Sequence, residues 1–116
     1  MHKLQNAKIG ICQGERVLFS DYANDGPMWV GTGPRAHNTD ITFDERFLTA
    51  PALHVGLTMW DIDNAQNQRV DISAEEITEA GFALVFKTWG DSRIARVRAS
   101  WMAIGALPHD DDWELY

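Results

Sequence analysis

Two apolar segments joined by a short turn constrain the fold of this chain more than any other feature. The segments cover residues 81–92 and 93–105. Phe82, Leu84 and Phe86 alternate with Ala83, Val85 and Lys87, which gives one strongly apolar face and is typical of a strand. The residues Trp89-Gly90-Asp91-Ser92 between the segments favour chain reversal, which predicts a β-hairpin. Because an isolated hairpin is not stable in water, the rest of the chain is expected to complete the sheet.

Shorter apolar segments predict further strands, and no long helix is expected. Strands are predicted at residues 4–12, 16–19, 35–43, 52–61 and 69–73, with a turn at residues 13–15. Residues 20–34 form a long loop rich in turn residues, and residues 74–80 a loop with some helical character. This spacing predicts an all-β fold, an antiparallel β-sandwich of about six strands. We expect one domain over residues 1–116, with its core at 4–105 and an acidic tail at 106–116.

Charge and composition exclude several classes of partner. The 116 residues carry a formal net charge of −7, which argues against a nucleic-acid backbone or an anionic membrane as partner. No apolar run is long enough to span a membrane, and the N-terminal residues lack a secretory signal. We therefore expect a soluble chain, whose location is otherwise left open. Cys12 is the single cysteine and is interpreted as a buried apolar residue, with an interchain bridge as the alternative.

The sequence favours neither enzymatic nor metal chemistry. Cys12, Ser100 and His54 fall in strand patterns without a nucleophile–base motif around them. Residues 61–64 resemble part of a calcium loop but lack the glycine and the terminal glutamate of an EF-hand. The acidic run at residues 109–112 would bind cations only weakly. No enzyme, cofactor or metal is predicted.

A set of short sequences, kept in order and spacing, runs through most of the chain. It consists of Ile41-Thr42-Phe43, Phe47, Pro51, Val55-Gly56-Leu57, Asp61, Gln66-Asn67-Gln68-Arg69-Val70, Gly81-Phe82, Thr88-Trp89 and Ala99-Ser100-Trp101-Met102-Ala103-Ile104. The set resembles the H-type lectin domain, the fold of snail agglutinins and of the C-terminal domain of discoidins. The resemblance implies a six-stranded sandwich that assembles as a trimer. It also implies binding of galactose-type sugars, above all N-acetylgalactosamine, in shallow clefts between subunits.

The resemblance also implies a set of carbohydrate-binding residues. The arginine of the family's QNxR segment corresponds to Arg69, and the tryptophan of its TW turn to Trp89. Gly90 follows, where snail-type members have histidine, so one hydrogen-bonding side chain is missing. Asp91 is expected to replace it in part.

The loop at residues 20–34 is longer than in snail-type members, so the family's acidic loop residue does not align to a single position. Asp25 is the first choice for it and Asp21 the second. Arginine offers a rigid fork of donors and a carboxylate offers two acceptors, so Arg69 and Asp25 would suit adjacent hydroxyls. Structural alternatives remain open. They are a surface ion pair for Arg69, packing for Trp89, and turn geometry for the acidic residue and the glycine.

Other residues carry two interpretations each. Trp60 and Trp101 are expected in the core or at a subunit interface, whereas Trp29 either lines the ligand cleft or anchors its loop. Arg96 and Arg98 share a strand face, and either pair with a neighbouring subunit or face solvent.

The sequence thus predicts a lectin whose partners are glycans and further copies of itself. A homotrimer is expected, with stacking into a hexamer left open, and multivalent sites would serve adhesion or attachment. The alternative is a structural or attachment module, such as the spike or fibre of a phage-like particle, in which sugar binding has lapsed or changed. Gly90 favours this alternative.

Overall fold

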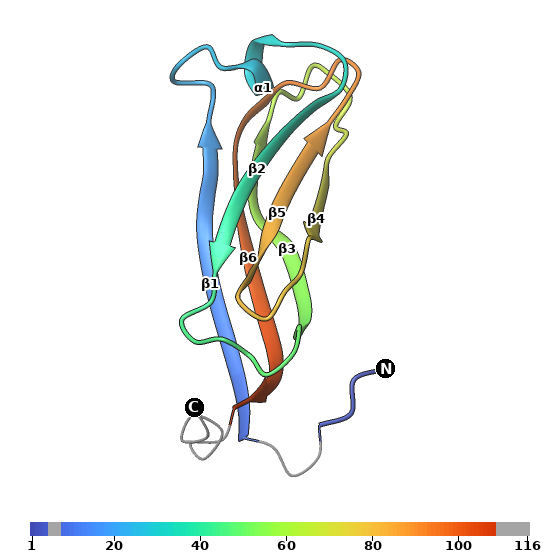
Figure 1. Cartoon of the computed structure of the whole chain (residues 1–116). Helices are drawn as coiled ribbons and strands as arrows, with labels where there is room; N and C mark the ends of the chain where they lie inside the picture. The colour runs from blue at the N-terminus through green and yellow to red at the C-terminus, as the bar shows by residue number, and fades with distance from the viewer. Residues whose placement is uncertain (5–7, 109–116) are drawn as a thin grey trace.

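The computed structural model describes residues 1–4 and 8–108, and its elements are those of this part of the chain. In order they are β1 (Lys8–Ser20), α1 (Pro27–Val30), β2 (Arg35–Thr42), β3 (Ala52–Ile62), β4 (Asp71–Glu75), β5 (Gly81–Thr88) and β6 (Ile94–Leu107). The strands form two antiparallel sheets, which we call the first sheet (order β1-β6-β3) and the second sheet (order β2-β5-β4) (Figure 1). The predicted six-stranded antiparallel sandwich is confirmed.

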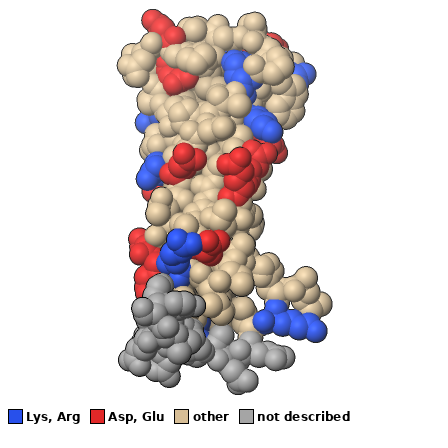
Figure 2. All heavy atoms as spheres, viewed as in Figure 1, with Lys and Arg blue, Asp and Glu red and all other residues tan. Residues whose placement is uncertain are grey.

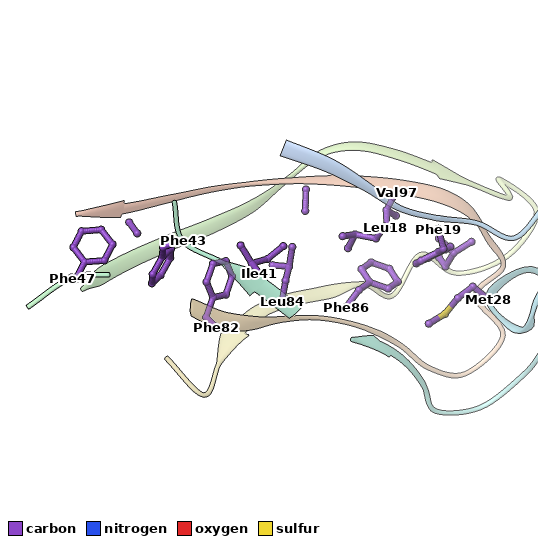
Figure 3. Close-up of a cluster of buried hydrophobic side chains, with 13 residues drawn as sticks. Leu18, Phe19, Met28, Ile41, Phe43, Phe47, Phe82, Leu84, Phe86 and Val97 are labelled. Atoms are coloured by element: carbon purple, nitrogen blue, oxygen red, sulfur yellow. The ribbon is translucent and has the colours of Figure 1, made fainter. Parts of the chain in front are cut away.

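The core lies between the two sheets (Figure 3). Phe82, Leu84 and Phe86 of β5 are 5%, 0% and 0% exposed, so the predicted apolar face is the core face. The remaining core residues are Leu18, Phe19, Met28, Ile41, Phe43, Phe47, Ile94, Val97, Ala99 and Ala103. Removal of these side chains from water supplies the main favourable term in folding.

The apolar segments β5 and β6 lie in different sheets, so the hairpin predicted for them is wrong. β5 is the central strand of the second sheet, and β6 is the central strand of the first sheet. Residues 89–93 therefore cross from one sheet to the other. Alternating apolar side chains indicate which face of a strand is buried but not which strands it pairs with, so the pattern does not distinguish a hairpin from two strands in facing sheets.

Residues 8–20 form one continuous strand, and the prediction of two short strands with a turn at residues 13–15 is also wrong. Gly14 pairs with Trp101, whose ring occupies the space that a Cβ at position 14 would need. Glycine is therefore required by the close approach of an indole and not by a chain reversal. Trp101 also packs edge-on against Phe82, with 6.2 Å between ring centroids.

Several smaller predictions need correction. β4 begins at Asp71, two residues later than expected, so Arg69 precedes the strand instead of opening it. Residues 76–80 form a loop without a helical turn. Residues 106 and 107 belong to β6 and not to the tail, whose residues 109–116 lie outside the described part. Trp60 is 59% exposed, which excludes it from the core of the single chain.

The arginines of β6 pair within their own chain. Nε of Arg96 lies 3.2 Å from Oδ2 of Asp61, and Nε of Arg98 lies 3.2 Å from Oε1 of Glu15. Each pair joins neighbouring strands of the first sheet. Exposed pairs of this kind add little stability. They nevertheless give both arginines a partner within their own chain, so no second copy is needed to pair them.

Three connections meet at the end of the sandwich that lies away from residues 1–4 and 107–108 (Figure 1). They are the β1–β2 loop, the β3–β4 connection and the β5–β6 connection, and they carry every predicted site residue. On the face shown in Figure 2, acidic and basic side chains are interspersed and do not form one patch of a single sign. Within the described residues, the structure contains no helix of the length and apolar character that crossing a membrane requires.

Candidate functional site

Arg69 and Asp91 meet between the β3–β4 and β5–β6 connections. Nη1 of Arg69 donates to Oδ1 of Asp91 at 2.6 Å, and the two side chains are 38% and 47% exposed. Asn67 donates from Nδ2 to the same carboxylate, 3.2 Å from Oδ2. Arg69 therefore does form the surface ion pair that was one of its two interpretations. Because both groups remain partly in water, a ligand can still reach them.

Two buried hydroxyls hold the Arg69 backbone against the end of β5. Thr88 donates from Oγ1 to the carbonyl of Arg69, and Ser92 accepts at Oγ from the backbone N–H of Arg69, at 2.9 Å. Ser92 also donates to the carbonyl of Asn67. Thr88 and Ser92 are 1% and 0% exposed, so these bonds lie in a low-dielectric environment. The position of Arg69 is therefore set by hydrogen bonds to β5 and to the turn that follows it, because Arg69 itself does not lie in a strand.

Gly90 occupies a backbone conformation that other residues adopt only with strain. Its φ is +68°, and a Cβ at this position would lie 3.2 Å from Nη1 of Arg69. Its carbonyl accepts from the backbone N–H of Gly33 at 2.9 Å and from Nη2 of Arg35 at 3.3 Å. The turn geometry therefore accounts for glycine here without reference to a ligand.

Trp89 projects from the same turn and is 44% exposed, so it lies outside the main core. It lines a shallow groove of about 330 Å³. The other lining residues are Pro34, Arg35, Ala36, Lys87 and Thr88. The groove thus combines an indole with mostly apolar walls, next to the polar Arg69–Asp91 pair.

The acidic loop residues are not part of this cluster within one chain. Asp25 adopts φ +51° as a turn residue, and no described residue makes a hydrogen bond or ion pair with its side chain. Asp21 accepts at Oδ2 from the backbone N–H of Met28 at 2.9 Å, which ties it to the first turn of α1. The structure therefore brings together Arg69, Gly90 and Asp91, and leaves both acidic candidates outside.

Arg35 is a residue of this end that the sequence analysis did not identify. Its Nε donates to the carbonyl of Gly33 at 2.9 Å, and Nη1 donates to the carbonyl of Met28 at 3.1 Å. With its bond to Gly90, the guanidinium joins the β1–β2 loop to the β5–β6 turn. Burial lowers the pKa of Arg35 from its ordinary value. An arginine at the start of a strand gives no sequence signal for such a role.

Asp91 remains a carboxylate into acid. Desolvation raises its pKa, but hydrogen bonds from Asn67 and from backbone donors, together with the charge of Arg69, outweigh this effect. The pKa of Asp91 therefore lies below its ordinary value of 3.8. At neutral pH the cluster presents one guanidinium and one carboxylate to any ligand.

Comparison with known proteins assigns the family. Residues 38–104 match the H-type lectin domain, more than half of the chain. The chain belongs to the H-type lectin family. This membership indicates a carbohydrate-binding lectin.

Relatives of this H-type lectin include a protein of Fuscovulum blasticum described as "ATP synthase subunits region ORF 7". It is 58% identical over 109 residues, which cover 94% of this chain and 95% of the relative. Discoidin-2 of Dictyostelium discoideum is 33% identical over 82 residues, which cover 69% of this chain. The matched region spans only 32% of that discoidin.

The lectin also shares its fold with a solved structure of discoidin II from Dictyostelium discoideum. The TM-score is 0.73 at 24% identity, over 93% of this chain and 40% of the discoidin chain. At this identity the likeness shows the fold alone. It confirms the two three-stranded sheets as a discoidin-like arrangement.

Proposed function

We propose that this H-type lectin binds galactose-type sugars, with a preference for N-acetylgalactosamine, at the end of the sandwich that carries Arg69, Trp89 and Asp91. The observation that supports this most is the Arg69–Asp91 pair, 2.6 Å apart and half-exposed, beside a tryptophan 44% exposed on the same turn. Planar polar groups next to an aromatic face are what a sugar requires. Its hydroxyls need donors and acceptors, and its C–H patch needs an apolar surface.

The pair has hydrogen-bonding capacity left for a ligand. Among the described residues, only Nη1 of the Arg69 guanidinium has a partner, so Nε–H and the Nη2 hydrogens can donate to a sugar. Oδ2 of Asp91 accepts one bond from Asn67 and can accept another. Asp91 thus holds the guanidinium in place and offers an acceptor itself, which supports its proposed role beside Gly90, where a side chain is absent.

Self-association would explain where the acidic loop residue belongs. The Asp25 side chain has no partner among the described residues, yet it lies on a loop at the same end as the Arg69 cluster. In a symmetric oligomer this loop can face the cluster of the next copy. We therefore propose that Asp25 completes the site of the next copy in a homotrimer. Two such trimers could stack into a hexamer.

The outer faces of the two sheets differ in a way that supports this assembly. Outward-facing Ile9, Ile11 and Val17 of β1 are 45%, 63% and 49% exposed, and Met102 of β6 is 37% exposed. The Arg98–Glu15 ion pair lies among these residues on the first sheet. The second sheet presents mainly exposed polar residues, among them Asn38 and Asp40 of β2 and Asp71 and Glu75 of β4. Exposed apolar side chains gathered on one face mark an interaction surface. The first sheet is the face we assign to contacts between subunits.

Calorimetric titration with N-acetylgalactosamine and galactose tests the sugar assignment. We expect weak single-site binding, and stronger retention on a glycan-coated surface because several sites engage at once. Silence toward galacto-configured and acidic glycans alike would remove the lectin proposal. Light scattering measured on the same sample reports the oligomeric state separately.

A second candidate is a structural or attachment module, such as the spike or fibre of a phage-like particle, with lapsed or altered sugar binding. Gly90 favours it, because glycine here leaves Arg69 to pair with Asp91 without a further polar side chain on the turn. A stable oligomer that binds none of the tested glycans would support this candidate. Both candidates are non-enzymatic.

A further inference from the structure

A second groove lies at the same end of the sandwich. It has a volume of about 530 Å³, within the range of small-molecule sites, and shares no lining residue with the groove of Trp89. The β1–β2 loop supplies Tyr22 and Trp29, and the end of β3 with its following residues supplies Asp61, Asp63 and Asn64.

The aromatic wall of this groove is held in place by Arg93. The carbonyl of Trp29 accepts from Nε of Arg93 at 3.0 Å, and the guanidinium carbon lies 4.2 Å from the centroid of the Trp29 ring. Tyr22 packs edge-on against Trp29, with 5.1 Å between centroids, and is itself 65% exposed. A fixed indole thus supports an exposed phenol ring, an aromatic surface that loses little entropy on binding.

The polar side of the groove is only partly satisfied. Asp63 is engaged at both oxygens: Oδ2 lies 3.3 Å from Nη1 of Arg93, and Oδ1 accepts from the backbone N–H of Ala65 at 2.9 Å. Asp61 uses Oδ2 for Arg96, and no described residue donates to its Oδ1.

Two neutral polar groups lie in the same groove as Oδ1 of Asp61. Among the described residues, neither the amide of Asn64 nor the hydroxyl of Tyr22 has a hydrogen-bond partner. One acceptor and two groups that both donate and accept therefore surround the aromatic wall. This set matches vicinal hydroxyls better than it matches a single charge.

From this geometry we propose that the groove of Tyr22, Trp29, Asp61 and Asn64 is a second carbohydrate subsite, which takes a neutral hexose unit. The inference rests on the proposed lectin function and adds a second binding position per chain. Arg96 and Arg93 pair with the carboxylates of Asp61 and Asp63, but the oxygen left open, Oδ1 of Asp61, can only accept hydrogen bonds. A sugar hydroxyl suits this acceptor, whereas the carboxylate of an anionic sugar such as sialic acid does not. A glycan with two or more hexose units on one surface could engage both sites, which would raise avidity.

The indole N–H signals of Trp29 and Trp89 report the two grooves in ¹H–¹⁵N spectra, once each is assigned with a Trp→Phe variant. Because Trp29 shares its loop with Asp25, Arg69→Ala shows whether a Trp29 shift arises in this groove or in the site of the next copy. The full chain is titrated with N-acetylgalactosamine, galactose, lactose and N-acetylneuraminic acid. We expect a neutral sugar to shift the Trp29 signal and N-acetylneuraminic acid to leave it in place. Tyr22→Ala should weaken the Trp29 response about tenfold and spare that of Trp89. Leu48→Ala, at an apolar residue 54% exposed near the other end, is the control and should change neither.

The outcomes separate the two proposals. A shift of Trp89 without any shift of Trp29 overturns the second subsite and leaves the proposed function intact. A shift of Trp29 that Arg69→Ala does not weaken supports the second subsite as independent. If neither indole responds to any sugar, both proposals fall. A Trp29 response that persists in both Tyr22→Ala and Asp61→Ala would also refute the groove.

Discussion

Nη1 of Arg69 lies 2.6 Å from Oδ1 of Asp91, although 22 positions separate the two residues in the chain. The contact joins the β3–β4 connection to the turn that crosses between the sheets. It exists because Thr88 and Ser92, both buried, hold the Arg69 backbone against the end of β5. The candidate site is therefore a property of how the two sheets are joined.

Arg69→Ala should weaken binding of N-acetylgalactosamine about 10- to 100-fold, because hydrogen bonds from a charged donor are lost. Stability should change little, since the side chain is 38% exposed. Arg46→Ala is a matched control, because Arg46 also pairs with an exposed carboxylate, that of Glu79, away from the site. Calorimetry and thermal unfolding of both variants check this. Unchanged affinity in Arg69→Ala would exclude Arg69 from the site.

Trp89→Ala should reduce affinity about tenfold by removing the aromatic face, whereas Trp89→Phe should retain part of it. Because Trp89 is 44% exposed, the oligomer mass should stay that of the wild type. Fluorescence or calorimetric titration gives the affinity, and light scattering gives the mass. If Trp89→Ala bound sugar as the wild type does, the indole would be a packing residue only.

Gly90→Ala and Gly33→Ala form a matched pair, because both glycines have positive φ, +68° and +73°. Each variant should lose about 1 kcal/mol of unfolding free energy through backbone strain. Only Gly90→Ala should also weaken sugar binding, since its Cβ would lie 3.2 Å from Nη1 of Arg69, while a Cβ at Gly33 meets nothing within 4 Å. Equal affinities in the two variants would show that Arg69 tolerates the displacement.

Sugar binding should be insensitive to pH from about pH 7 to about pH 4.5, because the pKa of Asp91 lies below its ordinary value. A carboxyl whose pKa is lowered on folding contributes stability that is complete above its unfolded value of 3.8. That contribution is lost as the pH falls through the lower folded value. Asp91→Asn should remove the acid-dependent loss and weaken binding at neutral pH. Titrations at several pH values test both expectations, and a loss of binding near pH 6 would point to another group.

Ile11→Glu should shift the oligomer toward monomer without unfolding it, because Ile11 is 63% exposed on the outer face of the first sheet. Charge on a contact face is costly to bury, whereas charge on a solvent face is not. Thr42→Glu, at an exposed position of β2 in the second sheet, is the control and should keep the wild-type mass. Sedimentation measures both, and an unchanged mass for Ile11→Glu would remove the first sheet from the proposed interface.

Much of the fold follows from local pattern. Alternation in residues 81–88 identified a strand and placed Phe82, Leu84 and Phe86 on one face of it, since successive side chains point to opposite sides of a strand. The same logic failed at Gly14, where glycine suggested a turn. The indole of Trp101, distant in sequence, is what requires glycine there.

By itself, the sequence determined the six-stranded antiparallel class, the core residues Phe82, Leu84 and Phe86, and the family, because side-chain periodicity and residue order are local properties. Tertiary structure decided that β5 and β6 belong to different sheets, since burial pattern carries no information about the pairing partner. It also decided that Arg69 and Asp91 meet and that Asp25 stands apart. Those distances depend on loop paths fixed by long-range hydrogen bonds, such as those of Arg35 to carbonyls on two connections.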